Sequence, residues 1–193
     1  VSEFMLQQTQ VSTVIPYFRK FINNIPDIET LATFDDQKLL KFWEGLGYYT
    51  RVRNLKKTAQ VVIKDFNRNI PSNFSELKSL PGIGDYTASA ISAIAFNKPY
   101  IPLDGNIERV LKRYLYLKKE HQMTKENLQI EKKIFGFTKR SSDYAQALME
   151  LGALICKPNN PNCDQCPISS KCISLKKKDF VLNKIKKKNK DKY

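Results

Sequence analysis

Apolar residues in this sequence recur at the spacing of α-helices, and this pattern limits the folds open to the chain. In segments 11–22 and 39–43 they stand three or four positions apart or side by side, which places them on one helix face. The same spacing covers 55–66, 74–80, 86–96, 107–117 and 144–155, with short Pro, Gly or Asn interruptions between the segments. Ser2 is expected to cap a first helix, with Glu3 in its first turn. Because no period-two alternation is long enough for a strand, the sequence predicts an all-α fold without internal repeats.

The composition supports a folded protein away from membranes. The chain has 193 residues, of which 41% are hydrophobic, enough for the core of one domain or of two small ones. No run approaches the eighteen apolar residues of a membrane span, and the first twenty residues are unlike a signal peptide. We therefore expect no membrane association and a soluble, cytoplasmic location.

The formal net charge of +14 suggests a polyanionic partner such as nucleic acid or an anionic membrane surface. Half of that charge comes from Lys176 to Tyr193, where nine Lys stand against two Asp. We expect this tail to be a basic linker or a disordered end. A Lys-rich, Arg-poor composition also fits AT-rich coding, so charge alone does not identify the partner.

All four cysteines fall within seventeen residues, with the spacing C-x6-C-x2-C-x5-C. The cluster is too local for scattered core thiols, and disulfides are rare in intracellular proteins. Four thiolates suit either zinc or an iron-sulfur cluster. Zinc sites usually carry two C-x2-C pairs, and only Cys163 and Cys166 form such a pair. We therefore favour an iron-sulfur cluster, which four ligands would saturate, so that a structural or redox-sensing role is expected.

The stretch 80–84, LPGIG, separates two predicted helices. Glycines allow the main chain to approach a phosphate closely, and the N-terminus of the next helix supplies N–H donors and a favourable dipole. The pattern indicates a helix-hairpin-helix that binds the DNA backbone irrespective of sequence. An ordinary glycine turn is the alternative for a bare Gly-x-Gly.

A carboxylate follows the hairpin in the stretch Leu103-Asp104-Gly105-Asn106, where Asp104 alone is typical of a helix cap or a turn. The hairpin, this Asp and the cysteine spacing together resemble the endonuclease III superfamily of DNA glycosylases. Two further stretches, VSEFMLQQTQ at 1–10 and WEGLGYY at 43–49, resemble its adenine DNA glycosylase (MutY) branch. The resemblance runs from Val1 to about Leu175 and implies the helix-hairpin-helix glycosylase fold.

The resemblance implies that the chain removes adenine paired with 8-oxoguanine or guanine, after the nucleotide is extruded from double-stranded DNA. Adenine is a poor leaving group, so a ring nitrogen must be protonated as the glycosidic bond breaks. Glu3 matches the general acid, its pKa raised by desolvation. Asp104 matches the carboxylate that stays ionised and stabilises the positive sugar. Bifunctional relatives carry a Lys where this chain has Tyr86, which implies a monofunctional enzyme with Tyr86 bonding in the pocket.

The resemblance also implies DNA contacts. Gln8, Leu46 and Tyr48 match residues that wedge into the duplex or contact the oxidised guanine. Without the family match, Leu46 and Tyr48 would be interpreted as core residues and Gln8 as helix surface. The remaining residues predicted to bind DNA are Gly82, Gly84 and Asn106. The expected ligands of a 4Fe-4S cluster are Cys156, Cys163, Cys166 and Cys172.

The implied organisation is a six-helix domain containing the hairpin at 1–98, an iron-sulfur cluster domain at 99–175, and the basic tail at 176–193. Family members also have a helical segment upstream and a C-terminal domain that recognises 8-oxoguanine, so we expect this chain to be a fragment, and a monomer. Two alternatives stay open: a bifunctional glycosylase/lyase acting on oxidised pyrimidines, and a non-catalytic DNA-binding module. The single His121 is expected to be exposed rather than catalytic.

Overall fold

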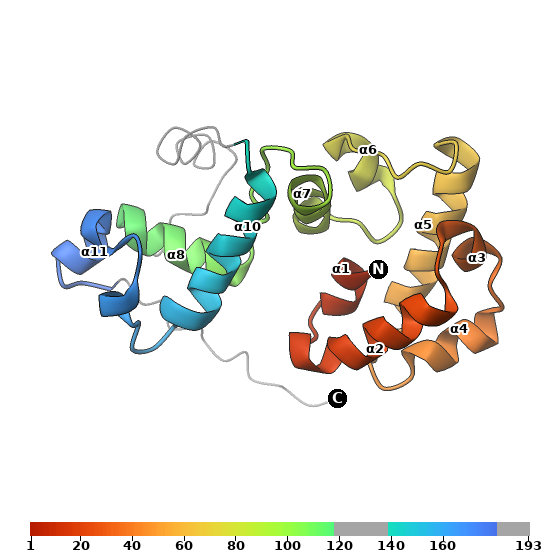
Figure 1. Cartoon of the computed structure of the whole chain (residues 1–193), viewed down its shortest axis with the longest axis horizontal. Coiled ribbons are helices and arrows are strands. Elements are labelled where there is room, and N and C mark those ends of the chain that lie inside the picture. The colour runs from red at the N-terminus through yellow and green to blue at the C-terminus, as the bar shows by residue number, and fades with distance from the viewer. Residues whose placement is uncertain (118–138, 181–193) are drawn as a thin grey trace, which may run out of the picture. The chain divides into compact units, whose positions relative to one another are not determined.

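The structure of the protein is a computed structural model that describes residues 1–117 and 139–180 (Figure 1). Every regular element within these ranges is helical and no strand occurs among them, which confirms the predicted all-α class. None of these helices has the length and apolar character needed to cross a bilayer. His121 and residues 181–193 of the basic tail lie outside the described residues.

Packing divides the chain into two compact units, Val1–Pro102 and Leu103–Tyr193. The functional labels given above to the parts of the chain stay predictions. The first unit contains α1 (Ser2–Leu6), α2 (Val11–Asn24), α3 (Ile28–Thr33), α4 (Asp36–Trp43), α5 (Thr50–Asp65), α6 (Phe74–Ser79) and α7 (Asp85–Ile94).

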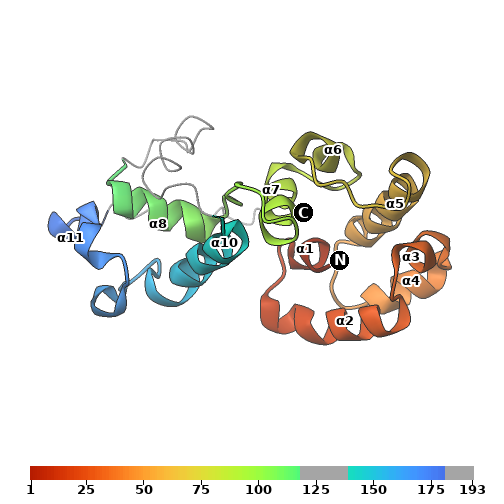
Figure 2. The same ribbon diagram turned by 45° about the horizontal axis from the view of Figure 1, so that its top comes forward.

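The core of the first unit is formed by the apolar faces of these helices. On α5 the buried residues Val52, Leu55, Ala59 and Val62 follow the three- and four-residue spacing seen in the sequence. The short helix α1 contacts α2, α5 and α7, and both ribbon views show it among them (Figures 1 and 2). This central position is what buries the side chains at the start of the chain.

Two details of the first unit differ from the sequence interpretation. Helix α3 was not expected; Asp27 caps it by accepting a hydrogen bond from the Thr30 N–H at 2.7 Å, and capping compensates for its short length. Ser2 does not cap α1, because the helix already includes it and Val1 stands at the cap position without a side-chain bond. The predicted Ser2 cap was therefore wrong by one residue.

The second unit contains α8 (Gly105–Leu115), α10 (Ser141–Glu150), the π-helical turn η1 (Leu151–Ile155), the 3-10 turns η2 (Cys163–Gln165) and η3 (Ser169–Lys171), and α11 (Ile173–Lys176). Helix α8 contacts α10, η1 and α11. Gly152 allows η1 to approach the start of α8, since a Cβ there would lie 2.7 Å from the Cβ of Asn106. The elements that flank the cysteine-rich segment therefore pack against α8.

Candidate functional site

Glu3 lies on α1 at the wall of an apolar cavity of about 390 Å³ within the first unit. Most of the lining is aliphatic or aromatic and includes Phe4, Ile22 and Ile91. The Oε2 atom of Glu3 is buried, and no hydrogen bond to it is formed by the described residues. Burial raises the pKa of the Glu3 carboxyl, and the Val1 amino group opposes this shift. A raised pKa is the direction that a general acid requires near neutral pH.

The predicted hairpin is a turn between α6 and α7 that is tied to two other helices. The Thr58 hydroxyl of α5 donates to the Pro81 carbonyl at 2.8 Å. From the residue after α1, the Gln7 amide donates to the Gly82 carbonyl at 3.3 Å and to the Thr87 hydroxyl at 3.4 Å. The turn is therefore held in place by the same unit that carries Glu3.

The two hairpin glycines have different structural roles. Gly82 has a left-handed φ of +77°, and a Cβ there would lie 2.8 Å from the Cβ of Asn54, so only glycine fits without a shift. Gly84 caps α7 with an ordinary φ of −90°, and a Cβ there would meet nothing within 4 Å. The open space at Gly84 lies at the N-terminus of α7, where the helix dipole favours an anion. Asp85 in the first turn is neutralised by Lys78 at 2.6 Å.

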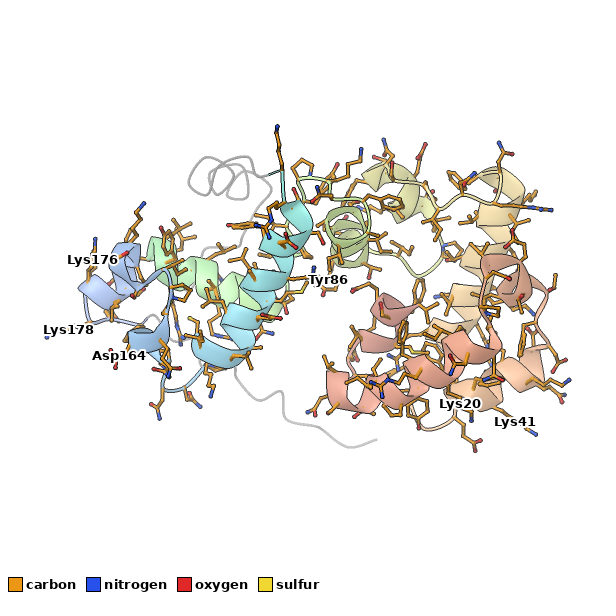
Figure 3. All side chains as sticks on the ribbon, in the orientation of Figure 1. Lys20, Lys41, Tyr86, Asp164, Lys176 and Lys178 are labelled. Carbon is orange, nitrogen blue, oxygen red and sulfur yellow. The ribbon has the colours of Figure 1, made fainter. Side chains whose placement is uncertain are left out.

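Tyr86 lies in the first turn of α7, directly after the hairpin, and is 37% exposed. Figure 3 labels it on that helix. Its proposed hydrogen bonds in a base pocket stay a prediction.

The residues predicted to contact the duplex differ in how exposed their side chains are. Tyr48 is 64% exposed, whereas Leu46 is only 6% exposed and packs in the hydrophobic core. The interpretation of Leu46 without the family match, as a core residue, agrees with this burial, and its contact with DNA stays a prediction. Gln8 and Tyr48 both have left-handed backbone angles, with φ of 58° and 47°, which non-glycine residues rarely adopt.

Asp104 caps α8 and is held at both carboxylate oxygens. Oδ1 accepts from the Ile107 N–H at 2.7 Å and Oδ2 accepts from the Asn106 amide at 3.2 Å. The Asn106 oxygen accepts from Arg109 Nη2 at 2.8 Å, and Arg109 Nε donates to the Cys156 carbonyl at 2.8 Å. A chain of hydrogen bonds thus joins Asp104 to the first cysteine, and the predicted DNA contact of Asn106 would compete with it.

The four cysteines line one pocket of the second unit, together with apolar residues that include Val110 and Leu175. Arg113 Nη1 donates to the Cys156 sulfur at 3.4 Å. Burial raises the pKa of the Cys163 thiol, and the other three cysteines raise it further. Over residues 1–117 and 139–180, no three His, Cys, Asp or Glu side chains are grouped so that one metal ion could bind them all. The donor set is four thiols around a shared space, which fits a cluster with one thiolate at each of four irons.

The chain folds back onto α8 after the last cysteine. The Tyr116 hydroxyl donates to Asp179 Oδ2 at 2.6 Å, and this bond raises the pKa of Tyr116. The ring of Phe180 lies 5.7 Å from the guanidinium carbon of Arg113 and lines the same pocket as the cysteines. Phe180 therefore covers one side of the thiol pocket.

Sequence reasoning missed three buried or half-buried arginines. Arg109 and Arg113 stand four residues apart on α8, which places them on one helix face toward the cysteine segment. Arg51 is buried and lies two residues after the Gly-Leu-Gly-Tyr-Tyr stretch. Only their positions in the sequence could have indicated them. Arg109 and Arg113 form a helical i, i+4 pair, and Arg51 is a charged residue close to a glycine-rich turn.

A family model described as HhH-GPD superfamily base excision DNA repair protein matches residues 1–134 of the chain. The chain belongs to this superfamily. Among solved structures, a thermostable thymine-DNA glycosylase is 28% identical with a TM-score of 0.81, covering 91% of this chain and 82% of that one. An endonuclease III in a non-covalent complex with DNA is 25% identical with a TM-score of 0.73, covering 91% and 81%. These neighbours confirm the predicted helix-hairpin-helix glycosylase fold.

The chain is also similar to curated adenine DNA glycosylases. The one from Buchnera aphidicola subsp. Baizongia pistaciae is 46% identical over 190 residues, which is 95% of this chain and 52% of that protein. This chain spans about half the length of such bacterial relatives.

Proposed function

We propose that this chain is the catalytic part of an adenine DNA glycosylase that releases adenine paired with 8-oxoguanine or guanine. The observation that carries the proposal is the Glu3 carboxyl, which lies in an apolar wall where burial raises its pKa. Such a carboxyl keeps the proton that adenine must receive before it leaves. The similarity to adenine DNA glycosylases over most of the chain supports the choice of base.

In the proposed reaction, Glu3 gives its proton to an imidazole-ring nitrogen of adenine. The bond between adenine and C1′ of the deoxyribose breaks, and its electron pair leaves with the base. Asp104 stabilises the positive sugar, and its two hydrogen-bonded oxygens fix the direction of its charge. Water then adds to C1′ and returns a proton to Glu3, so the products are adenine and an abasic sugar.

We infer that base removal is not followed by strand cleavage. The lyase reaction of bifunctional enzymes needs an amine that forms a Schiff base with the sugar. The first turn of α7 offers Tyr86, whose phenol cannot form one. This difference separates the proposal from a glycosylase/lyase acting on oxidised pyrimidines.

The proposed partner is double-stranded DNA, and the similar endonuclease III is in complex with DNA. The N-terminus of α7 binds a phosphate beside Gly82 and Gly84, while Gln8 and Tyr48 contact the base opposite the excised adenine. Leu46 and Asn106 complete the proposed contacts. The chain acts as a monomer.

We further propose that Cys156, Cys163, Cys166 and Cys172 hold a 4Fe-4S cluster. Four thiols around a common pocket, with Arg113 beside Cys156, support a shared thiolate site. The single C-x2-C pair favours a cluster over one zinc ion. When bound, the cluster would crosslink the short turns of the segment from Cys156 to Cys172.

One experiment tests the proposed reaction. The purified chain is incubated with duplexes that carry A opposite 8-oxoguanine, A opposite guanine, or thymine glycol, each with and without alkali afterwards. We expect alkali-dependent cleavage at both adenine mispairs and none at thymine glycol. Cleavage at thymine glycol without alkali would instead establish the bifunctional class.

A further inference from the structure

Arg51 lies in the first turn of α5 with only 6% of its surface exposed. Its Nη1 group donates to the carbonyl oxygens of Met5 and Gln7, each at 2.7 Å. The Phe4 carbonyl at 3.2 Å and the Thr9 hydroxyl at 3.1 Å accept longer bonds from the same group. These carbonyls are available because the last carbonyls of a helix have no donors within it. Arg51 thus holds the end of α1 and the residues after it.

The other amino group of Arg51 binds the loop between α4 and α5. Nη2 donates to the carbonyl oxygens of Leu46 at 2.9 Å and Gly47 at 3.1 Å. Trp43 supports the same loop, since its Nε1 also donates to the Gly47 carbonyl at 3.1 Å. The guanidinium carbon lies 5.4 Å from the Trp43 ring centre and 5.5 Å from the Tyr48 ring centre. One side chain therefore joins two segments about forty residues apart.

Arg51 binds the carbonyl immediately before each of two left-handed residues. Gln8, with φ of 58°, follows Gln7, and Tyr48, with φ of 47°, follows Gly47. Such angles cost on the order of 1 kcal/mol or more and persist only where the surroundings hold them. The bonds to Arg51 provide that hold at both turns.

The charge of Arg51 has an unusual environment for a structural arginine. In the described part of the chain it forms no ion pair with a carboxylate, and its Nε has no hydrogen-bond partner there. Among the described residues, the buried charge is offset by carbonyl dipoles, the Thr9 hydroxyl and two aromatic rings. Burying a charge in this way is costly, which argues for a role beyond filling the core.

We infer that Arg51 is a positioning residue that sets Gln8 and Tyr48 at a fixed spacing, and that this spacing contributes to recognition of the base opposite the excised adenine. The inference rests on the proposed function, in which Gln8 and Tyr48 contact that base. Lys keeps the charge but carries one nitrogen instead of a planar fork. Arg51→Lys therefore cannot hold both segments at once.

The test compares affinity for a duplex with a mispair against affinity for a fully paired duplex. The mispair is 8-oxoguanine opposite 2′-fluoro-2′-deoxyadenosine, which resists base release. We expect Arg51→Lys to lower this affinity ratio by about tenfold while binding to paired DNA stays unchanged. The matched control is Arg53→Lys, on the exposed side of the same helix, which should leave the ratio unchanged.

A double-mutant cycle separates positioning from general stability. If Arg51 acts through Gln8 and Tyr48, Arg51→Lys has no further effect on the ratio once both are replaced by Ala. Hydrogen exchange gives a readout that needs no DNA: amides of 6–10 and 46–49 should exchange faster together, with other first-unit helices unchanged. Additive losses in the cycle, or faster exchange throughout the unit, would overturn the inference.

Two further outcomes distinguish this inference from the proposed function. If the unmodified chain does not prefer the mispair, the proposed function and the role of Arg51 are both overturned. If the unmodified chain prefers the mispair and Arg51→Lys keeps that preference, only the role of Arg51 is overturned.

Discussion

Glu3 carries a carboxyl whose pKa is raised by burial and whose Oε2 finds no hydrogen bond among the described residues. The folded protein therefore binds this proton more tightly than the unfolded chain does. Stability contributed by such a group is fully present below the ordinary pKa of Glu and is lost as pH rises through the raised folded value. The proposed acid thus destabilises the fold at the pH at which it works.

We predict that Glu3→Gln slows base release by about 100-fold or more, because an amide cannot donate the required proton. At pH values above neutral, Glu3→Gln should also raise the unfolding temperature. This increase in unfolding temperature should vanish below about pH 4. Single-turnover kinetics and thermal melts at several pH values measure both effects. The exposed Glu150→Gln serves as control, and an equally active Glu3→Gln would remove Glu3 from the chemistry.

Asp104 combines a structural and a proposed electrostatic role, and two substitutions separate them. Asn caps helices as well as Asp, so Asp104→Asn should keep the fold while base release falls by about 100- to 1,000-fold. Asp104→Ala should also lose about 1 kcal/mol of stability, since the bond to the Ile107 N–H is lost. Urea unfolding and single-turnover rates test this. Unchanged turnover in Asp104→Asn would show that its charge is not used.

At the scale of the helices, the hairpin offers a contrast between its two glycines. Gly82→Ala should destabilise the fold by about 1–3 kcal/mol, because its φ of +77° and the approach of Asn54 both disfavour a Cβ. Gly84→Ala should cost less than about 1 kcal/mol, yet weaken DNA binding for all sequences, because its methyl group occupies the approach to α7.

The measurement for the hairpin is urea unfolding beside fluorescence anisotropy with two unrelated duplexes over a range of salt. For the unmodified chain, log affinity should fall with log salt by about 0.9 per phosphate contact. If Gly84→Ala binds both duplexes with unchanged affinity, the stretch is a turn and not a phosphate site.

The longer helices were predictable because each buries one face, so their apolar residues repeat three or four positions apart, as Val52 and Leu55 do on α5. Helix α3 was not predictable in the same way, since its six residues bury only Leu31 and Ala32. Its signal was the cap at Asp27, which is a hydrogen bond and not a periodicity. Short helices depend on such local bonds more than on pattern.

For the molecule as a whole, the iron-sulfur proposal makes a prediction that needs no activity. The purified chain should be brown and should contain about four iron atoms per molecule. Phe180→Ala should bleach faster in air than the unmodified chain, because the ring lines the pocket of the cysteines. Metal analysis and visible absorbance over time are the measurements. One zinc and no iron after anaerobic purification would refute the cluster.

Candidate site residues that stand in recognisable stretches, such as Glu3 and the cysteines, could be proposed from the sequence. Arg51 and Arg109 could not, because their roles arise from main-chain carbonyls such as those of Gln7 and Cys156. Every residue has a main-chain carbonyl, so the sequence does not indicate which carbonyls accept hydrogen bonds from an arginine. That information comes only from the folded structure.

The hold of Arg51 on the main chain also affects how this protein can evolve. Five of its six acceptors are main-chain carbonyls and only Thr9 contributes a side chain. Side chains at Gln8 and Tyr48 can therefore be exchanged by mutation while the framework that presents them is retained. If Gln8 and Tyr48 contact the lesion as proposed, single substitutions at these two positions would change the lesion preference without rebuilding the loops.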